Sequence, residues 1–68
     1  MSSEVRFTQV RKLLVSHGWT CSRIRGSHHI FTKEGELPIS VPVHRQKVKY
    51  FYVRKTKKIL EDEKQTGD

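Results

Sequence analysis

One short segment, Leu37 to Val43, constrains the fold more than any other part of this sequence. Its apolar residues occupy every second position, the pattern of a β-strand with one buried face. The segment also contains Pro38 and Pro42, and proline has no N–H to donate to a neighbouring strand. Both prolines stand at even positions, so both missing donors lie along the same side. The segment is therefore expected to form the edge of an antiparallel sheet and to pair through its odd-numbered residues.

Helical and strand patterns flank this edge strand. Apolar residues at helical spacing precede Gly18, which stands where a helix commonly ends, and Gly26 and Ser27 form a turn signal between two further strands. The alternation in the first of those strands is poor. The predicted elements are a helix over about 4–17, strands over 19–25, 28–33 and 37–43, and a helix from 48 or 49 to 63. Together they predict an α+β fold, with a three-stranded antiparallel meander covered by both helices on one face.

Size limits what this fold can hold. The chain has 68 residues, which suits one domain over 1–68, with a core over about 5–60 and a short acidic tail over 61–68. Such a chain buries only about 60% of its unfolded surface, so a deep pocket for a large cofactor is not expected. The single cysteine excludes an internal disulfide framework and fits a cytoplasmic protein. No apolar run approaches the roughly 18 residues of a membrane span, and no secretory signal pattern is present.

The charge distribution indicates a polyanionic partner. Lys and Arg number 14 against 7 Asp and Glu, a formal net charge of +7. The segment from His44 to Lys58 contains no acidic residue. Such a concentration is typical of proteins that bind nucleic acid, and each phosphate contact would make binding sensitive to salt. An acidic protein partner would explain the same charge. A helix that lies on a membrane surface is a further alternative, because such a helix can be anchored by the aromatic residues Tyr50, Phe51 and Tyr52.

Histidines are the ready candidates for catalysis, because histidine titrates near neutral pH. There are four: His17, His28, His29 and His44. RNA cleavage requires a base for the ribose 2′-OH, an acid for the leaving oxygen and cations beside the phosphate, without a deep pocket. A zinc site that combines Cys21 with His28, His29 and His44 lacks the usual ligand spacing. No metal ligand set is therefore predicted.

Several segments resemble, in order and spacing, the HicA (YcfA-like) toxin family. They are Val10 to Leu14, His17-Gly18-Trp19, Arg23, Gly26 to Phe31, and Val41-Pro42-Val43-His44. The resemblance covers about residues 5 to 60 and implies a small mRNA interferase of a type II toxin–antitoxin system. It also implies an α-β-β-β-α fold like that of a double-stranded RNA-binding domain, with activity from a histidine of the Gly-Ser-His motif. The implied partners are mRNA and a HicB-like antitoxin that covers the motif.

The last helix departs from the family pattern at both ends. Many members start it with a Gly-Thr-Leu type sequence and end it with Ala-Gly. This chain has Lys49 to Lys55 and Glu61 to Glu63 at those places.

The two adjacent histidines of the motif are expected on opposite faces of the sheet, because side chains alternate along a β-strand. Neighbouring strand residues point to opposite faces, so His28 shares a face with Ile30, and His29 shares one with Phe31. If Phe31 packs under the helices, His28 lies on the open face. We therefore expect His28 to be the catalytic residue, with His29 as the second choice. The turn residue Ser27 is expected to orient the backbone.

The expected RNA contacts lie around the motif and at the start of the basic segment. They are Arg23, Arg25, Ser27, Lys33, His44, Arg45 and Lys47. Trp19 either stacks on a base or, as we expect, packs where the first helix meets the first strand. The leading interpretation is a cytoplasmic, metal-independent mRNA endoribonuclease that needs no cofactor. A noncatalytic RNA-binding module of the same fold, and a protein whose basic face serves an acidic partner alone, remain as alternatives.

Overall fold

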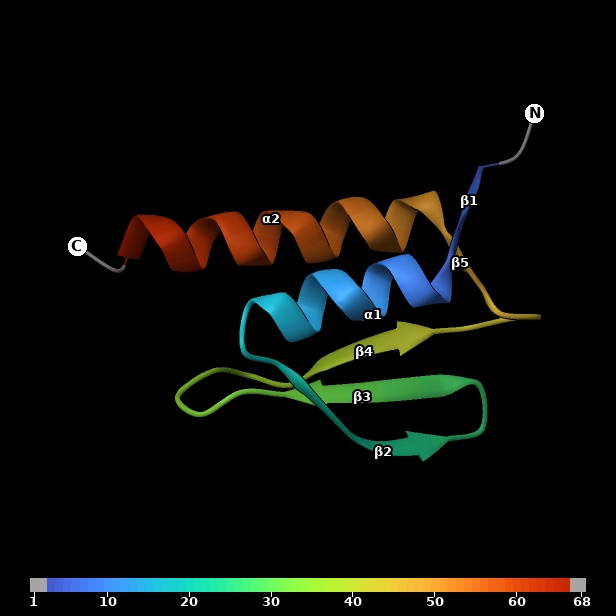
Figure 1. The fold of residues 1–68 in the computed structure, drawn as a ribbon, viewed down its shortest axis with the longest axis horizontal. Helices are drawn as coiled ribbons and strands as arrows, with labels where there is room; N and C mark the ends of the chain where they lie inside the picture. Colours follow the sequence, from blue (N-terminus) through green and yellow to red (C-terminus); the bar gives the residue numbers. More distant parts are fainter. Residues whose placement is uncertain (1–2, 67–68) are drawn as a thin grey trace.

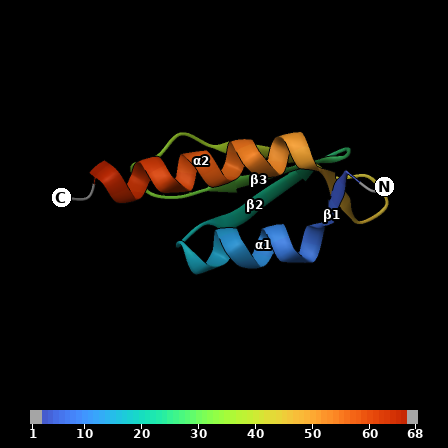
Figure 2. The same cartoon turned by 90° about the horizontal axis from the view of Figure 1, so that it is seen from above.

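The described residues form seven helices and strands. The computed structural model describes residues 3–66, and side chains as far as residue 63. In chain order the elements are β1 (Glu4–Arg6), α1 (Phe7–Ser16), β2 (Thr20–Arg25), β3 (His28–Thr32), β4 (Ile39–Pro42), β5 (Lys47–Lys49) and α2 (Tyr50–Thr66). Strands β2, β3 and β4 form one antiparallel sheet, and both helices lie over one of its faces (Figure 1, Figure 2). The predicted α+β architecture is therefore confirmed, and within residues 3–66 the second face of the sheet stays open.

The edge position of the proline-containing strand is also confirmed. The order in the sheet is β2-β3-β4, so β4 lies at one side of it. The N–H of Val43 donates to the carbonyl oxygen of Ser27 at 2.7 Å, which shows that the odd-numbered residues face β3. Pro42 and the preceding Pro38 consequently have their missing donors on the outer side. The strand is shorter than the predicted 37–43, because regular pairing covers only Ile39–Pro42.

A second, two-stranded sheet corrects the predicted start of both helices. Strand β1 pairs antiparallel with β5, with Val5 directly opposite Val48. The amide of Phe7 donates to the carbonyl oxygen of Gln46 at 2.8 Å, and the amide of Tyr50 donates to that of Ser3 at 2.7 Å. These bonds hold 4–6 and 47–49 extended, so α1 begins at Phe7 instead of about 4, and α2 at Tyr50 instead of 48 or 49. Cross-strand pairing overrides local helical propensity here.

The core lies between the helices and the covered face of the sheet. Helix α1 contributes Phe7, Val10 and Leu14, at the i, i+3 and i+7 spacing of one helix face. Phe31 of β3 and Val41 of β4 are fully buried beneath them. The core residues from the rest of the chain are Trp19, Ile39, Val48, Val53 and Leu60, and the buried Thr56 lies within the α2 stripe.

Near its C-terminal end, α2 contacts the junction between α1 and β2 through a hydrogen bond. Trp19 is buried, as expected from its position at this junction, and its Nε1–H donates to Oε1 of Glu63 at 3.4 Å. The ammonium group of Lys33 lies 3.5 Å from the same oxygen. Glu63 thus joins the last described turns of α2 to two residues just outside the strands, Trp19 before β2 and Lys33 after β3. The departure from the family pattern at Glu61 to Glu63 therefore supplies a tertiary contact.

The turn between β4 and β5 adopts a conformation that its residues do not favour. His44 and Lys47 exchange both backbone hydrogen bonds, at 2.9 Å each, around a two-residue loop. Arg45 and Gln46 in that loop have φ of 53° and 67°. Two positive φ values define a type I′ turn, for which glycine and asparagine are the usual residues. The turn therefore stores backbone strain.

Replacing Gln46 by glycine should relieve part of this strain. We expect Gln46→Gly to stabilise the fold by about 0.5–1 kcal/mol, after allowance for the greater freedom of glycine in the unfolded chain. Urea denaturation followed by circular dichroism measures the change. Gln46→Ala is the matched control, because alanine also shortens the side chain but keeps the strained φ. Equal stability of the two variants would show that backbone strain is not the cause.

Candidate functional site

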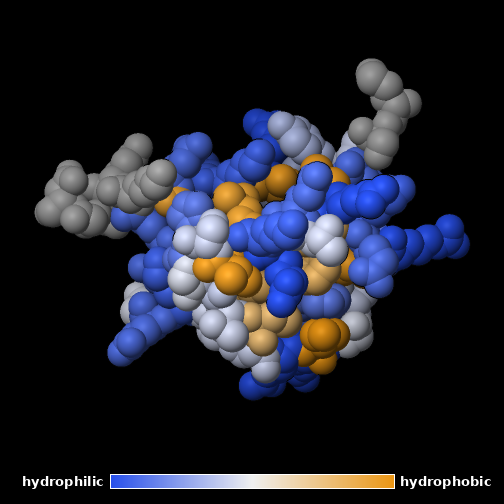
Figure 3. All heavy atoms as spheres, viewed as in Figure 1, coloured by the Kyte–Doolittle hydropathy of each residue, from blue (hydrophilic) through white to orange (hydrophobic). Residues whose placement is uncertain are grey.

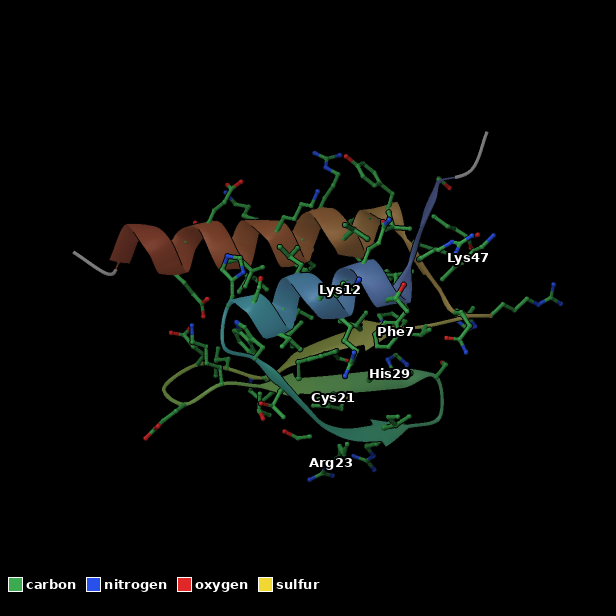
Figure 4. All side chains as sticks on the ribbon, viewed as in Figure 1. Phe7, Lys12, Cys21, Arg23, His29 and Lys47 are labelled. Carbon is green, nitrogen blue, oxygen red and sulfur yellow. The ribbon has the colours of Figure 1, made fainter. Side chains whose placement is uncertain are left out.

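A β-bulge decides which side chains reach the open face of the sheet. Strict alternation from Thr20 would place Arg23 and Arg25 on the covered face. The pairing of β2 with β3 shifts by one residue between Cys21 and Arg23, so that Arg23 lies opposite Ile30 and Arg25 opposite His28. Paired residues share a face. Both arginines therefore join His28 on the open face, and Figure 4 shows Arg23 pointing away from the helices.

The open face presents a mainly polar row of side chains from all three strands. By register these are Thr20, Arg23, Arg25, His28, Ile30, Thr32, Ser40 and Pro42. The hydroxyls of Ser22 and Thr32 are hydrogen-bonded to each other at one end of this row. Thus two cations, a histidine and several hydroxyls lie on a surface that no helix covers. Such a surface suits a phosphate-containing ligand.

His28 is exposed and held by a neighbouring strand. Its Nδ1 lies 3.2 Å from the hydroxyl oxygen of Ser40 on β4. The hydroxyl donates to Nδ1 in one tautomer and accepts from Nδ1–H in the other. In both cases Nε2, on the opposite side of the ring, is left to meet a ligand. Ser40 was absent from the predicted site, although the apolar alternation of 37–43, which buries the odd positions, already indicated the open face for position 40.

His29 occupies a different environment. Its ring centroid lies 4.5 Å from that of Phe7, and the side chain is partly buried on the covered face (Figure 4). Within the described part of the chain, Nδ1 of His29 is buried without a hydrogen-bond partner. The structure therefore places the second-choice histidine among core residues, separated from His28 by the thickness of the sheet.

The remaining predicted residues are divided among three places. Ser27 lies in the β2–β3 turn beside His28, and its backbone carbonyl accepts the bond from Val43. Lys33 follows the alternation of β3 to the covered side, where it pairs with Glu63. It is therefore not brought to the cluster around His28.

His44, Arg45 and Lys47 lie together at the β4–β5 turn. Arg45 and Lys47 line a hollow of about 340 Å³ with Arg6, Thr8 and Gln46. Lys47 stands directly opposite Arg6 in the β1–β5 pair, and Figure 4 shows it beside β5, well away from Arg23 at the lower margin. This second basic group belongs to the small sheet, not to the open face.

The zinc alternative finds no support in this arrangement. His28 projects from one face of the sheet, while Cys21 and His29 project from the other. Among the described residues no cluster of three or more His, Cys, Asp or Glu side chains is positioned to hold a metal ion.

In the described residues, α-helices long and apolar enough to cross a membrane are absent. A family model described as the HicA toxin of bacterial toxin–antitoxin systems matches residues 7–66, which is most of the chain. No curated protein and no solved structure gives a match.

Proposed function

The chain belongs to the HicA toxin family of bacterial toxin–antitoxin systems, and from this premise we propose that it cuts mRNA with His28 as its acid/base group. The observation that carries the proposal is the juxtaposition of His28 and Arg25 as cross-strand neighbours on the open face of the sheet. A proton-transfer group and a cation thus stand beside each other where a single-stranded RNA has access.

The proposed chemistry is an attack of the ribose 2′-oxygen on the adjacent phosphorus. In the tautomer whose Nδ1–H donates to Ser40, Nε2 of neutral His28 takes the 2′-OH proton, and the new P–O bond forms as the bond to the 5′-oxygen breaks. The departing oxygen takes up a proton, which solvent on the exposed face supplies. Arg23 and Arg25 stabilise the charge that develops on the phosphate oxygens, and Ser40 orients the imidazole. The reaction as written requires no metal or cofactor.

Cleavage of a long single-stranded RNA in excess EDTA tests the proposal. We expect fragments to accumulate in EDTA and at low salt, with binding that weakens as salt rises. Fragments that form only after a divalent metal is restored would contradict the metal-independent reaction.

The second candidate, a noncatalytic RNA-binding module, is favoured by the exposure of His28 on an uncovered sheet, and binding without cleavage would select it. A chain that serves an acidic protein partner alone would neither bind nor cut RNA.

A charge variant locates the RNA on the open face. Arg25→Gln should weaken binding across RNA sequences and lower the slope of log affinity against log salt by about 0.7, the value for one phosphate contact on a single strand. Arg11→Gln makes the same change on the exposed surface of α1, over the other face of the sheet, and should leave the slope nearly unchanged. Fluorescence anisotropy of a labelled RNA at several salt concentrations measures both. Equal slopes for the two variants would place the RNA elsewhere.

A further inference from the structure

The two outer strands of the main sheet differ in their capacity to accept another strand. Pro42 of β4 and Pro38 just before it lie along the outer side of that strand, so this edge offers few donors. Strand β2 contains no proline, and within residues 3–66 no other strand pairs with its outer side. Figure 1 shows β2 at the lower margin of the molecule with nothing beyond it. The sheet can therefore be extended at β2.

Register identifies the backbone groups that face outward. Because odd-numbered β3 residues bond to β4, even-numbered ones bond to β2, which turns the backbones of Arg25 and Arg23 inward. Ile24, which lies between them, directs its N–H and C=O outward. These groups form the row to which a partner strand would bind.

The side chains along β2 specify the chemistry of such a strand. Arg23 and Arg25 extend over the open face, whereas Cys21 and Ile24 lie on the other side. Ile24 is 59% exposed although it is on the helix side, and Figure 3 shows an apolar patch in the region of β2. A strand added here would meet two cations on one face and the exposed apolar side chain of Ile24 on the other. Acidic and apolar residues in alternation satisfy both faces at once.

A second copy of the chain does not meet this requirement. Two β2 strands that pair antiparallel about a twofold axis would bring four arginines to one face, because residues 23 and 25 of both copies lie there. Like charges on neighbouring strands destabilise pairing. The net charge of +7 adds to the repulsion. The arginines therefore disfavour self-association while they leave the edge open to an acidic strand.

We propose that the antitoxin partner adds a strand of alternating acidic and apolar residues to the outer side of β2. Its carboxylates pair with Arg23 and Arg25, and its apolar residues cover Ile24. Since Arg25 is the cross-strand neighbour of His28, the added strand withdraws the phosphate-binding cations from the site. Only this effect on cleavage rests on the proposed function, because strand addition itself does not require RNA chemistry.

A defined peptide tests the binding. The probe is a short blocked peptide of alternating glutamate and valine, added to the ¹⁵N-labelled full chain. We expect the Ile24 amide to exchange with solvent about tenfold or more slowly in the complex, with no matching change along β4. A peptide of the same composition with its glutamates and valines in separate blocks is the control. Equal protection by both peptides, or protection along β4 instead, would overturn the proposal.

Two variants test the edge itself. Ile24→Pro removes the outward N–H and should weaken peptide binding about tenfold or more, whereas Ile24→Val keeps the N–H and should bind like the wild type. If Ile24→Pro does not fold, the double variant Arg23→Glu with Arg25→Glu replaces it. That variant should no longer bind the glutamate–valine peptide and should instead bind a peptide of alternating lysine and valine. Unchanged peptide preference in the charge-reversed variant contradicts the inference.

Cleavage assays separate this inference from the proposed function. Peptide protection of Ile24 by a chain that never cuts RNA would support strand addition and reject the nuclease. RNA cleavage that continues unchanged when the peptide saturates β2 would reject the regulatory role.

Discussion

His28→Ala is expected to lower the rate of RNA cleavage by about 10²–10⁴-fold, the usual contribution of a positioned acid/base group. RNA affinity should change little, because Arg23 and Arg25 remain on the open face. The fold should also remain, since His28 is exposed and contributes nothing to the core. Cleavage and binding of one labelled RNA, measured in the same EDTA buffer, provide the comparison.

The adjacent histidine is the matched control. His29→Ala removes a side chain that packs on Phe7, so it should reduce stability while the folded fraction still cuts RNA. Ser40→Ala should give a smaller loss of rate than His28→Ala, because it removes the group that orients the imidazole but leaves Nε2 in place. If His29→Ala abolishes cleavage in a folded chain and His28→Ala does not, the catalytic role belongs to His29.

Trp19→Ala should have the largest effect on stability. The indole is 2% exposed, and removal of such a side chain from a core costs about 3–5 kcal/mol. A domain of 68 residues has a total stability of roughly 3–10 kcal/mol, so the variant should be largely unfolded in the least favourable case. Because the chain contains one tryptophan, urea denaturation must be followed by far-ultraviolet circular dichroism instead of fluorescence.

Trp19→Phe separates the contribution of apolar packing to stability from that of the indole hydrogen bond. Phenylalanine retains much of the apolar volume but removes the Nε1–H that donates to Glu63. We expect a smaller loss than for alanine, with part of it arising from the lost hydrogen bond. Full stability in Trp19→Ala would mean that the indole is not a core residue, and would favour the alternative in which Trp19 stacks on an RNA base.

The alternation of apolar residues at every second position allowed the sheet, and the face on which His28 lies, to be predicted from the sequence. Pro42 of β4 and the preceding Pro38 identified the edge, and the burial of Phe31 placed His28 on the open face. The same period places Lys33 with Phe31 on the covered side, so its expected role near His28 conflicted with the alternation. Its contact with Glu63 depends on the end of α2, which no local pattern reveals.

Features that depend on a single inserted residue, or on pairing between distant segments, could not be predicted from the sequence. One extra residue in β2 moves both arginines to the open face, and poor alternation over 19–25 was the only local sign of this bulge. The β1–β5 pair rests on Val5 and Val48, each an isolated apolar residue between charged ones. Strands this short have no statistical pattern, and their existence depends on the chain reversals that bring them together.

The contact between His29 and Phe7 has a spectroscopic consequence. An aromatic ring at 4.5 Å generates a local magnetic field that displaces the proton resonances of the imidazole packed against it. His28, which lies on the far side of the sheet, does not experience that field. The two adjacent histidines should therefore give well-separated signals in a proton spectrum, so that the binding of RNA can be followed at His28 alone.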